Sequence, residues 1–184
     1  DLPFIDDGWI ANSHATHVGG TIAGTHDSEG IAGICPNCKL SGMNFYLHEI
    51  PELLEDAIEN NFRIINMSWS YGLIPYGIPP LDLNCDEANN WMELEQCAIW
   101  EALNEYNIVI FAAAGNDGYE WTGGPFNFPA TYDGVVSVVA TDCLDKKAFF
   151  SSYHESDDVS APGHNIVSSI SWLEPRRGVC IAGW

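Results

Sequence analysis

Two periods in the spacing of apolar residues predict the secondary structure of this chain. In EIPELLEDAIENN, residues 49–61, the apolar positions share one face of a helix and acids occupy the opposite face. WMELEQCAIWEALNEY, residues 91–106, predicts a second helix. Short apolar runs predict strands at residues 39–47, 63–69, 108–114 and 134–142, and a loop rich in Pro, Gly and Asn spans 71–90. Because helices and strands alternate, we expect an α/β domain with a parallel sheet.

A further helix is predicted where SHATHVGGTIAG, residues 13–24, places two histidines before a series of small residues. Ser13 is expected to be the N-cap, so that His14 is the first helical residue. Ala15, Gly19 and Ala23 recur at every fourth position and form one smooth stripe. Glycine inside a helix costs about 1 kcal/mol relative to alanine, so the stripe indicates a close neighbour. The residues alone leave open a buried helix with incidental histidines.

Charge and composition exclude several classes of function. Of the 184 residues 26 are acidic and 6 are Lys or Arg, which gives a formal net charge of −20. Nucleic acids and anionic membranes both require basic surfaces, so neither is expected as a partner. No apolar run approaches the roughly 20 residues of a membrane helix. No signal peptide is visible and the chain begins at Asp1, so a mature chain or an excised piece is expected.

The six cysteines allow three interpretations. Cys35 and Cys38 form a CxxC pair, which is typical of a redox motif or of half a zinc site. A second CxxC is absent, and no thioredoxin-like context surrounds CPNC. An even number of cysteines in so acidic a chain favours disulfides and an oxidising compartment.

Two of the predicted strands end in polar segments that are candidates for a site. Functional residues of parallel α/β sheets lie just beyond the carboxyl ends of the strands. Here IINM runs into SWSYG, and IVIFAAA runs into GNDG. Asn116 in the second segment is equally typical of a simple turn, but the three alanines before it indicate that something lies close to that strand end.

Six segments resemble, in order along the chain, the motifs of the subtilisin-like serine proteases (subtilases, peptidase family S8). They are SHATHVGGTIAG (13–24), GIAGICPNCKL (30–40), IINMSWS (64–70), FAAAGNDG (111–118), FPATYDGVVSVVATD (128–142) and FFSSYHESDDVSAPG (149–163). The resemblance implies a three-layer α/β fold with a mostly parallel central sheet and helices on both faces. It also implies a serine endopeptidase that acts on polypeptides through an Asp-His-Ser triad.

The same resemblance implies roles for individual residues. His14 matches the general base, a role suited to histidine because this side chain titrates near neutrality, and His17 matches a structural histidine. Asn116 matches the oxyanion-hole asparagine, and Asp117 falls at the rim of the pocket for the residue before the cut. The segments expected to bind substrate are Ser68, Trp69, Ser70 and Tyr71 on one strand end and Ala113, Ala114 and Gly115 on the other.

Several positions depart from the family pattern. Ala15 stands where the family has glycine and Gly19 where it has alanine. Trp69 replaces a leucine, while Ser70 and Tyr71 replace two glycines, so these residues either reshape the pocket or adjust the packing. These departures leave a second hypothesis open, in which the protein is a non-catalytic pseudoprotease or a binding module.

Two members of the triad are not fixed by the sequence. FIDDG contains the family's aspartate pattern at Asp6, but only eight residues before His14, where the family has some thirty or more. We favour an aspartate that lies N-terminal to this sequence over Asp6. The nucleophile motif G-T-S-M-A-x-P is absent, and VCIAGW (179–184) resembles the strand that precedes it. Residues 1–184 are therefore expected to be one truncated peptidase domain that is inactive by itself.

The remaining expectations concern ligands, disulfides and location. Calcium is the family's usual structural cofactor, and Asp27 in THDSEGI occupies a loop that often binds it, although a solvated acidic turn is the alternative. Cys85 and Cys97 are expected to pair, because closing so short a loop contributes about 3 kcal/mol in the chain-entropy model. Cys35 with Cys38 is the next expected pair. A secreted or extracellular location follows, with an N-terminal propeptide as a partner in the parent protein.

Overall fold

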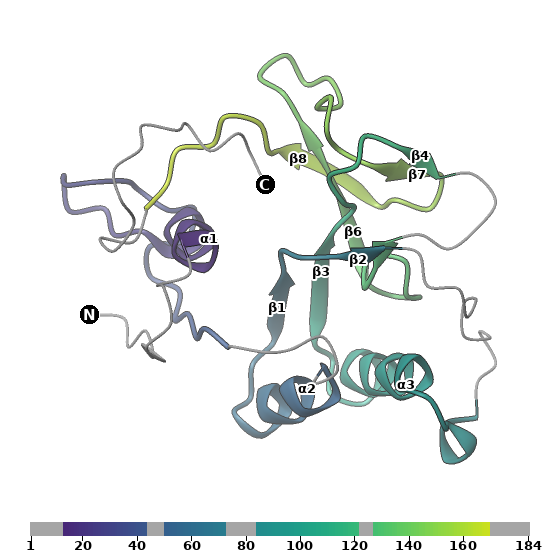
Figure 1. Cartoon of the computed structure of the whole chain (residues 1–184). Coiled ribbons are helices and arrows are strands. Elements are labelled where there is room, and N and C mark those ends of the chain that lie inside the picture. Colours follow the sequence, from purple (N-terminus) through teal and green to yellow (C-terminus); the bar gives the residue numbers. More distant parts are fainter. Residues whose placement is uncertain (1–12, 44–49, 73–83, 122–126, 170–184) are drawn as a thin grey trace. The chain divides into compact units, whose positions relative to one another are not determined.

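The computed structural model describes residues 13–43, 50–72, 84–121 and 127–169, which belong to two compact units (Figure 1). Of the described residues, those between 50 and 164 belong to the larger unit, and residues 13–43 and 165–169 belong to the smaller one. Each unit has its own internal packing.

A four-stranded parallel sheet forms the centre of the larger unit (Figure 1). Its strands, in spatial order, are β1 (Ile64–Met67), β3 (Val109–Ala113), β6 (Val136–Thr141) and β8 (Val159–Pro162). The first three lie within apolar runs that the sequence predicts as strands, and the fourth extends the sheet from a segment for which no strand is predicted. The parallel α/β fold expected from the sequence is therefore confirmed.

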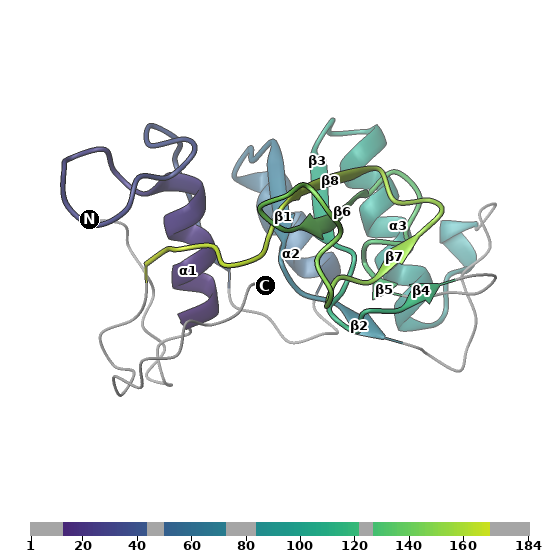
Figure 2. The same cartoon turned by 90° about the horizontal axis from the view of Figure 1, so that it is seen from above.

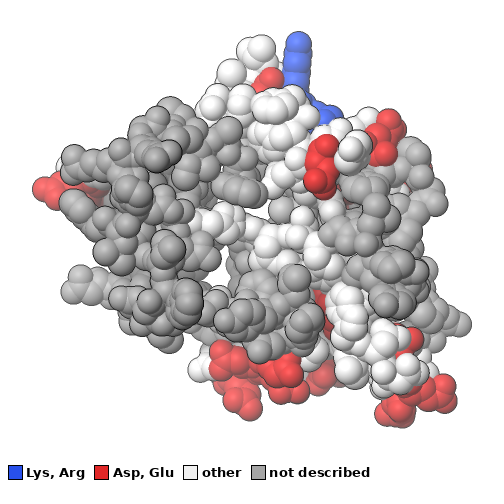
Figure 3. Space-filling view, in the orientation of Figure 1, with Lys and Arg blue, Asp and Glu red and all other residues white. Residues whose placement is uncertain are grey.

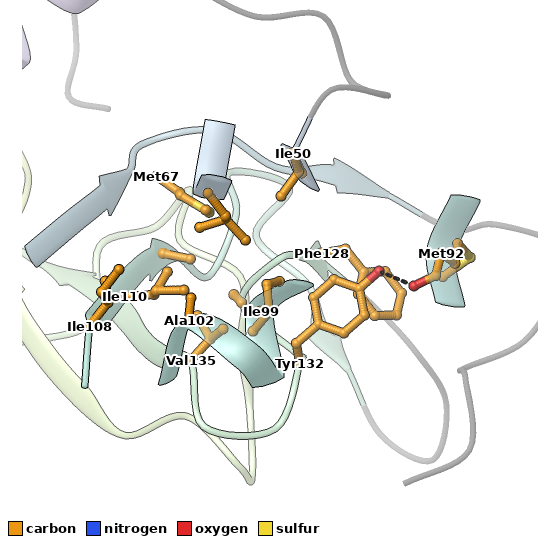
Figure 4. Packing of buried hydrophobic residues seen from close by; sticks show 13 residues of the cluster. Ile50, Met67, Met92, Ile99, Ala102, Ile108, Ile110, Phe128, Tyr132 and Val135 are labelled. Carbon is orange, nitrogen blue, oxygen red and sulfur yellow. Dashed lines mark hydrogen bonds between the residues drawn. The ribbon is translucent and has the colours of Figure 1, made fainter. Parts of the chain in front are cut away.

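Two helices pack on one another and bury their apolar faces against this sheet (Figure 2). They are α2 (Ile50–Glu59) and α3 (Trp91–Asn104), each within one or two residues of the predicted bounds. The side chain of Asn90 caps α3 by accepting hydrogen bonds from the backbone N–H groups of Met92 and Glu93. Figure 4 shows the resulting core, in which Ile50, Ile99 and Ile110 come from both helices and from β3.

Short elements that the sequence does not predict lie at the carboxyl edge of the sheet and beside it. β2 (Tyr71–Gly72) pairs antiparallel with β5 (Asn127–Phe128), and β4 (Glu120–Trp121) pairs parallel with β7 (Tyr153–His154). The 3-10 helix η1 (Cys85–Glu87) interrupts the predicted loop, and the predicted disulfide between Cys85 and Cys97 joins it to α3.

The smaller unit contains helix α1 (Ser13–Ala23), which begins at Ser13 and not after it. The expected N-cap is therefore wrong by at least one residue. The small residues near its end have a local cause, because the segment after the loop folds back onto the helix. The backbone N–H of Gly33 donates to the carbonyl of Gly24 at 2.8 Å, and a Cβ on Gly24 would lie 2.8–3.0 Å from backbone atoms.

In the rest of the smaller unit, part of a predicted strand is absent and a predicted disulfide is present. Residues 39–43 form no strand, and the remainder of the predicted strand, residues 44–47, lies outside the described residues. The disulfide between Cys35 and Cys38 is present, so these two sulfurs form neither a zinc site nor a free dithiol here.

The surface reflects the excess of acids. In Figure 3 acidic side chains gather along the lower edge, over α2 and η1, where the exposed acids are Glu52, Glu55, Asp56, Glu59, Asp86 and Glu87. Among the helices that the structure describes, none is long and apolar enough to span a membrane.

Candidate active site

The structure brings together the two polar strand ends that the sequence singles out. β1 and β3 are parallel neighbours, and Met67 is paired with Ala112. Segments 68–71 and 113–117 therefore leave the sheet at the same edge, side by side, as the strand-end rule predicts. The expected pocket segments and the expected oxyanion asparagine thus lie at the same edge of the sheet.

The turn that carries Asn116 is held by hydrogen bonds on both sides. The backbone N–H of Ser152 donates to the Gly115 carbonyl at 2.9 Å, and the Ser152 hydroxyl accepts from the Asp117 N–H at 3.1 Å. The Gly118 N–H donates to the Phe150 carbonyl at 2.7 Å. Asn116 and Asp117 are exposed, so the turn presents them to solvent from a fixed backbone.

Asn127 supports the same turn from β5. Its side chain is 3% exposed and donates to the Ala114 carbonyl at 2.5 Å. Gly115 has a φ of +105°, a conformation that L side chains rarely adopt, and a Cβ at this position would overlap the Asn127 amide. Glycine is required here for both reasons.

The Gly115→Ala variant is therefore expected to lose about 3 kcal/mol of unfolding free energy, from backbone strain and from the overlap with Asn127. Urea unfolding measures this loss. Gly30→Ala is the matched control, because Gly30 also has a positive φ, +66°, but a Cβ there meets nothing within 4 Å. It should lose about 1 kcal/mol. Equal losses in the two variants would contradict the proposed overlap.

Aromatic residues build the side of the site that lies over the core. Tyr71 stacks on Trp69, with ring centroids 5.9 Å apart, and on Phe128, with centroids 5.8 Å apart. Trp91 tilts against Tyr71 at 5.6 Å. For Tyr71 this arrangement favours the packing interpretation of the altered pocket residues, because its ring packs against the buried core cluster. Ser70 is exposed beside it.

A buried carboxylate lies beneath this aromatic side. Glu95 of α3 is 1% exposed, and one of its oxygens accepts a hydrogen bond of 2.5 Å from the Tyr71 hydroxyl. The Tyr132 hydroxyl lies 3.4 Å from that of Tyr71. Burial raises the pKa of Glu95 to about 7, while hydrogen bonding by the two tyrosines acts in the opposite direction. Burial and the nearby Glu95 raise the pKa of both tyrosines.

Sequence reasoning missed Glu95, although a signal was present. The buried residues of α3 are Met92, Glu95, Ile99 and Ala102, a spacing of three, four and three that marks one helix face. An acid within an apolar stripe predicts a buried and partnered carboxyl group.

The histidine helix lies in the smaller unit. His14 is half-buried near the start of α1, and Ala15 is exposed. His17 has the structural setting expected for it, since its Nε2 lies 3.2 Å from the Ile166 carbonyl. Its own carbonyl accepts a hydrogen bond from the Ser168 hydroxyl at 2.6 Å.

Two predicted residues have no site geometry in the structure. Asp6 lies outside the described residues, so its role stays a prediction. Asp27 is exposed, and its two oxygens accept from the Thr25 hydroxyl at 2.8 Å and the Glu29 N–H at 3.0 Å. These hydrogen bonds, that from Glu29 first, lower the pKa of Asp27. The described residues contain no group of three or more His, Cys, Asp or Glu side chains able to hold a metal ion.

A parallel α/β sheet with an asparagine turn and a second polar strand end at its carboxyl edge defines a subtilisin-like domain. Residues 7–179 match the sequence model of the subtilase family, and the chain belongs to this family.

Curated relatives agree with this assignment. The thermostable alkaline protease of Halalkalibacterium halodurans is 34% identical over 165 residues, a match covering 86% of this chain and 40% of that protein. Subtilisin DY of Bacillus licheniformis is 32% identical over 166 residues, covering 86% of this chain and 54% of that protein. The chain thus spans about half or less of the length of these relatives.

Solved structures show the same fold. The prenylagaramide maturation protease PagA superimposes with a TM-score of 0.66 at 27% identity, covering 86% of this chain and 55% of that one. The psychrophilic subtilisin-like protease Apa1 of Pseudoalteromonas sp. AS-11 superimposes with a TM-score of 0.65 at 26% identity. The match covers 86% of this chain and 34% of that one.

Proposed function

We propose that this chain is part of a secreted serine endopeptidase that hydrolyses peptide bonds of polypeptides through an Asp-His-Ser triad. The observation that carries the proposal is the rigid turn at 114–118, which presents the exposed Asn116 beside the strand end at 68–71. A fixed donor of this kind stabilises negative charge as it develops, without reorganisation during the reaction.

In this proposal each part of the site has one task. His14 takes the proton from the nucleophilic serine as its oxygen attacks the scissile carbonyl, and it later gives that proton to the leaving amine. The Asn116 amide donates to the carbonyl oxygen while this oxygen carries the negative charge. The family's nucleophile motif does not occur in the 184 residues, so in this proposal these residues alone are inactive. The triad aspartate is either Asp6 or, as we favour, a residue N-terminal to this sequence.

Substrate binding is assigned to the two strand ends. The backbone of residues 68–71 pairs with the extended substrate, and residues 113–115 line the pocket for the residue before the cut. Because Trp69 is half-buried against Tyr71, the apolar wall favours large hydrophobic residues in that pocket. Asp117 is exposed at the rim and adds a preference for basic over acidic residues.

The Asp117→Asn variant of the full-length protein is expected to lower the ratio of kcat/KM for Lys over Glu substrates by about two- to fivefold. The effect should be largest at low ionic strength, because salt screens a charge at an exposed rim. Peptide substrates that differ only in this residue give the ratio. Asp133→Asn, which removes an exposed charge outside the proposed site, serves as the control. An unchanged ratio at low salt would show that Asp117 does not face the substrate.

A non-catalytic pseudoprotease is the second candidate, favoured by Ala15 and by the altered residues 69–71. The exposure of Ala15 weakens this candidate, because its methyl group need not crowd the helix start. The deciding experiment treats the full-length protein with a fluorophosphonate probe and a casein substrate. Labelling and cleavage, both abolished by denaturation, support the peptidase. A folded protein that does neither supports the pseudoprotease.

Location and partners complete the proposal. Secretion is supported by the two disulfides and by relatives such as the minor extracellular protease Epr of Bacillus subtilis, which is 31% identical. We infer no nucleic-acid or membrane partner, because of the charge of −20. An N-terminal propeptide in the parent protein is part of the proposal. Structural calcium at the loop that contains Asp27 stays part of the proposal as the family resemblance implies it, although the described residues hold no group of three or more His, Cys, Asp or Glu side chains there.

A further inference from the structure

We propose that Glu95 is a positioning residue, which holds the substrate-binding segment 68–71 and the Asn116 turn at a fixed separation through the hydroxyl of Tyr71. This inference rests on the proposed peptidase function. Glu95 lies on α3, beneath the site, and is not expected to touch the substrate.

The burial of Glu95 is the first observation. Its side chain is 1% exposed within the core that Met92 and Ile99 help to form. Burying a carboxylate is costly unless hydrogen bonds compensate, and here one oxygen, Oε1, is buried without a hydrogen-bond partner. A leucine would fill the same place without this cost. The carboxylate therefore contributes through hydrogen bonding with the two tyrosines, chiefly through the bond that Oε2 accepts from Tyr71.

The second observation is that Tyr71 transmits this bond to the backbone of the site. Tyr71 is the last residue of the substrate-binding segment and the first of β2, where it is paired with Phe128 of β5. Its ring stacks on the rings of Trp69 and Phe128. Fixing the hydroxyl at the far end of a ring that is held by these two contacts leaves the strand little freedom to shift.

The third observation extends the connection to the oxyanion side. Asn127 precedes Phe128 in β5 and is paired with Gly72. Its side-chain amide donates to the Ala114 carbonyl, and Gly115 packs directly on that amide. A continuous series of contacts therefore runs from Glu95 through β2 and β5 to the turn that carries Asn116.

The protonation state of Glu95 decides how firmly Tyr71 is held. The titratable groups that face it are Tyr71 from β2 and Tyr132 from the segment after β5, and no charged group in the described part of the chain adds to them. An ionised Glu95 can only accept, so the Tyr71 hydroxyl must donate to it. A protonated Glu95 brings its own donor, and this requirement is relaxed.

The kinetic test uses the full-length protein with long peptide substrates and with single-residue esters, after active-site titration. Tyr71→Phe and Glu95→Leu should each raise KM for long peptides about fivefold and change kcat less than twofold. The double variant should be no worse than either single one, because both remove the same bond. Glu95→Gln retains an acceptor and should keep KM near the wild-type value.

Single-residue esters contact the wall of the pocket but do not pair along the backbone of residues 68–71, so their KM should rise clearly less than the KM for long peptides. Tyr106→Phe and Glu101→Leu, at exposed positions on and after α3, are the matched controls and should leave both substrates unaffected. Additive effects of the two single variants, or equal changes for esters and long peptides, would overturn the positioning role.

A test without activity separates this inference from the proposed function. The pKa of Glu95 is raised above its ordinary 4.5 to about 7 in the folded protein, so folding favours the protonated form. The stability that this contributes is present below about pH 4.5 and is lost as the pH rises to about 7. Between about pH 5 and about pH 8, the Tm of the Glu95→Gln variant should therefore fall less than the Tm of the wild type. A wild type without peptidase activity would refute the proposed function, whereas identical Tm profiles would refute the buried pair itself.

Discussion

Replacing His14 by alanine in the full-length protein is expected to lower kcat/KM for peptide cleavage by about 10⁴ or more. The size of the effect is taken from subtilisin itself, in which loss of one triad member removes nearly all the benefit of the triad. Its direction follows from the position of His14 near the start of α1 and from its match to the general base. Without the His14 imidazole, the neighbouring Ser13, Ala15 and Thr16 offer no group that accepts the serine proton at neutral pH.

His17→Gln provides the control for that experiment. His17 lies on the same helix, and its ring nitrogen Nε2 contacts the Ile166 carbonyl, a contact that a glutamine amide can also make. This variant should retain activity within tenfold and change mainly the unfolding temperature. Single-turnover kinetics with an acylating ester distinguishes the two variants, because only His14→Ala should lose the acylation step. A loss below tenfold for His14→Ala would mean that another residue is the base.

The elements that the sequence predicts well are those with enough residues to show a period. α2 and α3 each have apolar residues on one face over ten or more positions, and β1, β3 and β6 are apolar runs bounded by polar segments. The parallel sheet follows from their alternation. β2 and β5 have two residues each and therefore no period, and their pairing joins positions 71 and 128, far apart in the sequence.

The candidate site also has parts that the sequence predicts and parts that it does not. Strand-end logic and the family motifs place Asn116 and the segment 68–71 side by side without a structure. They do not predict what holds these segments, because the supports come from distant elements. Ser152 and Asn127 fix the turn from loops and short strands, and Glu95 anchors Tyr71 from a helix. A buried carboxylate is recognised in the sequence only if each polar residue in an apolar stripe is treated as a signal.

Replacing Asn116 by alanine is the second large effect expected, a fall in kcat of about 10²–10³. The figure is that found for the corresponding asparagine of a subtilisin, and it is adopted here for a member of the same family. KM should change little, because the amide meets its charged partner only in the transition state. Kinetics of the full-length variant with a long peptide substrate measures both constants.

Loss of the Asn116 amide can be distinguished from damage to the turn that carries it. The hydrogen bonds that hold the turn involve Gly115, Asp117 and Gly118, and Asn116 itself is exposed. Asn116→Ala should therefore keep the unfolding free energy within about 0.5 kcal/mol of the wild type. Asn127→Ala is the contrasting variant, because it removes the donor to the Ala114 carbonyl and should lower both stability and kcat. A fall in kcat below tenfold for Asn116→Ala, or a matching rise in KM, would show that its amide does not donate to the developing oxyanion.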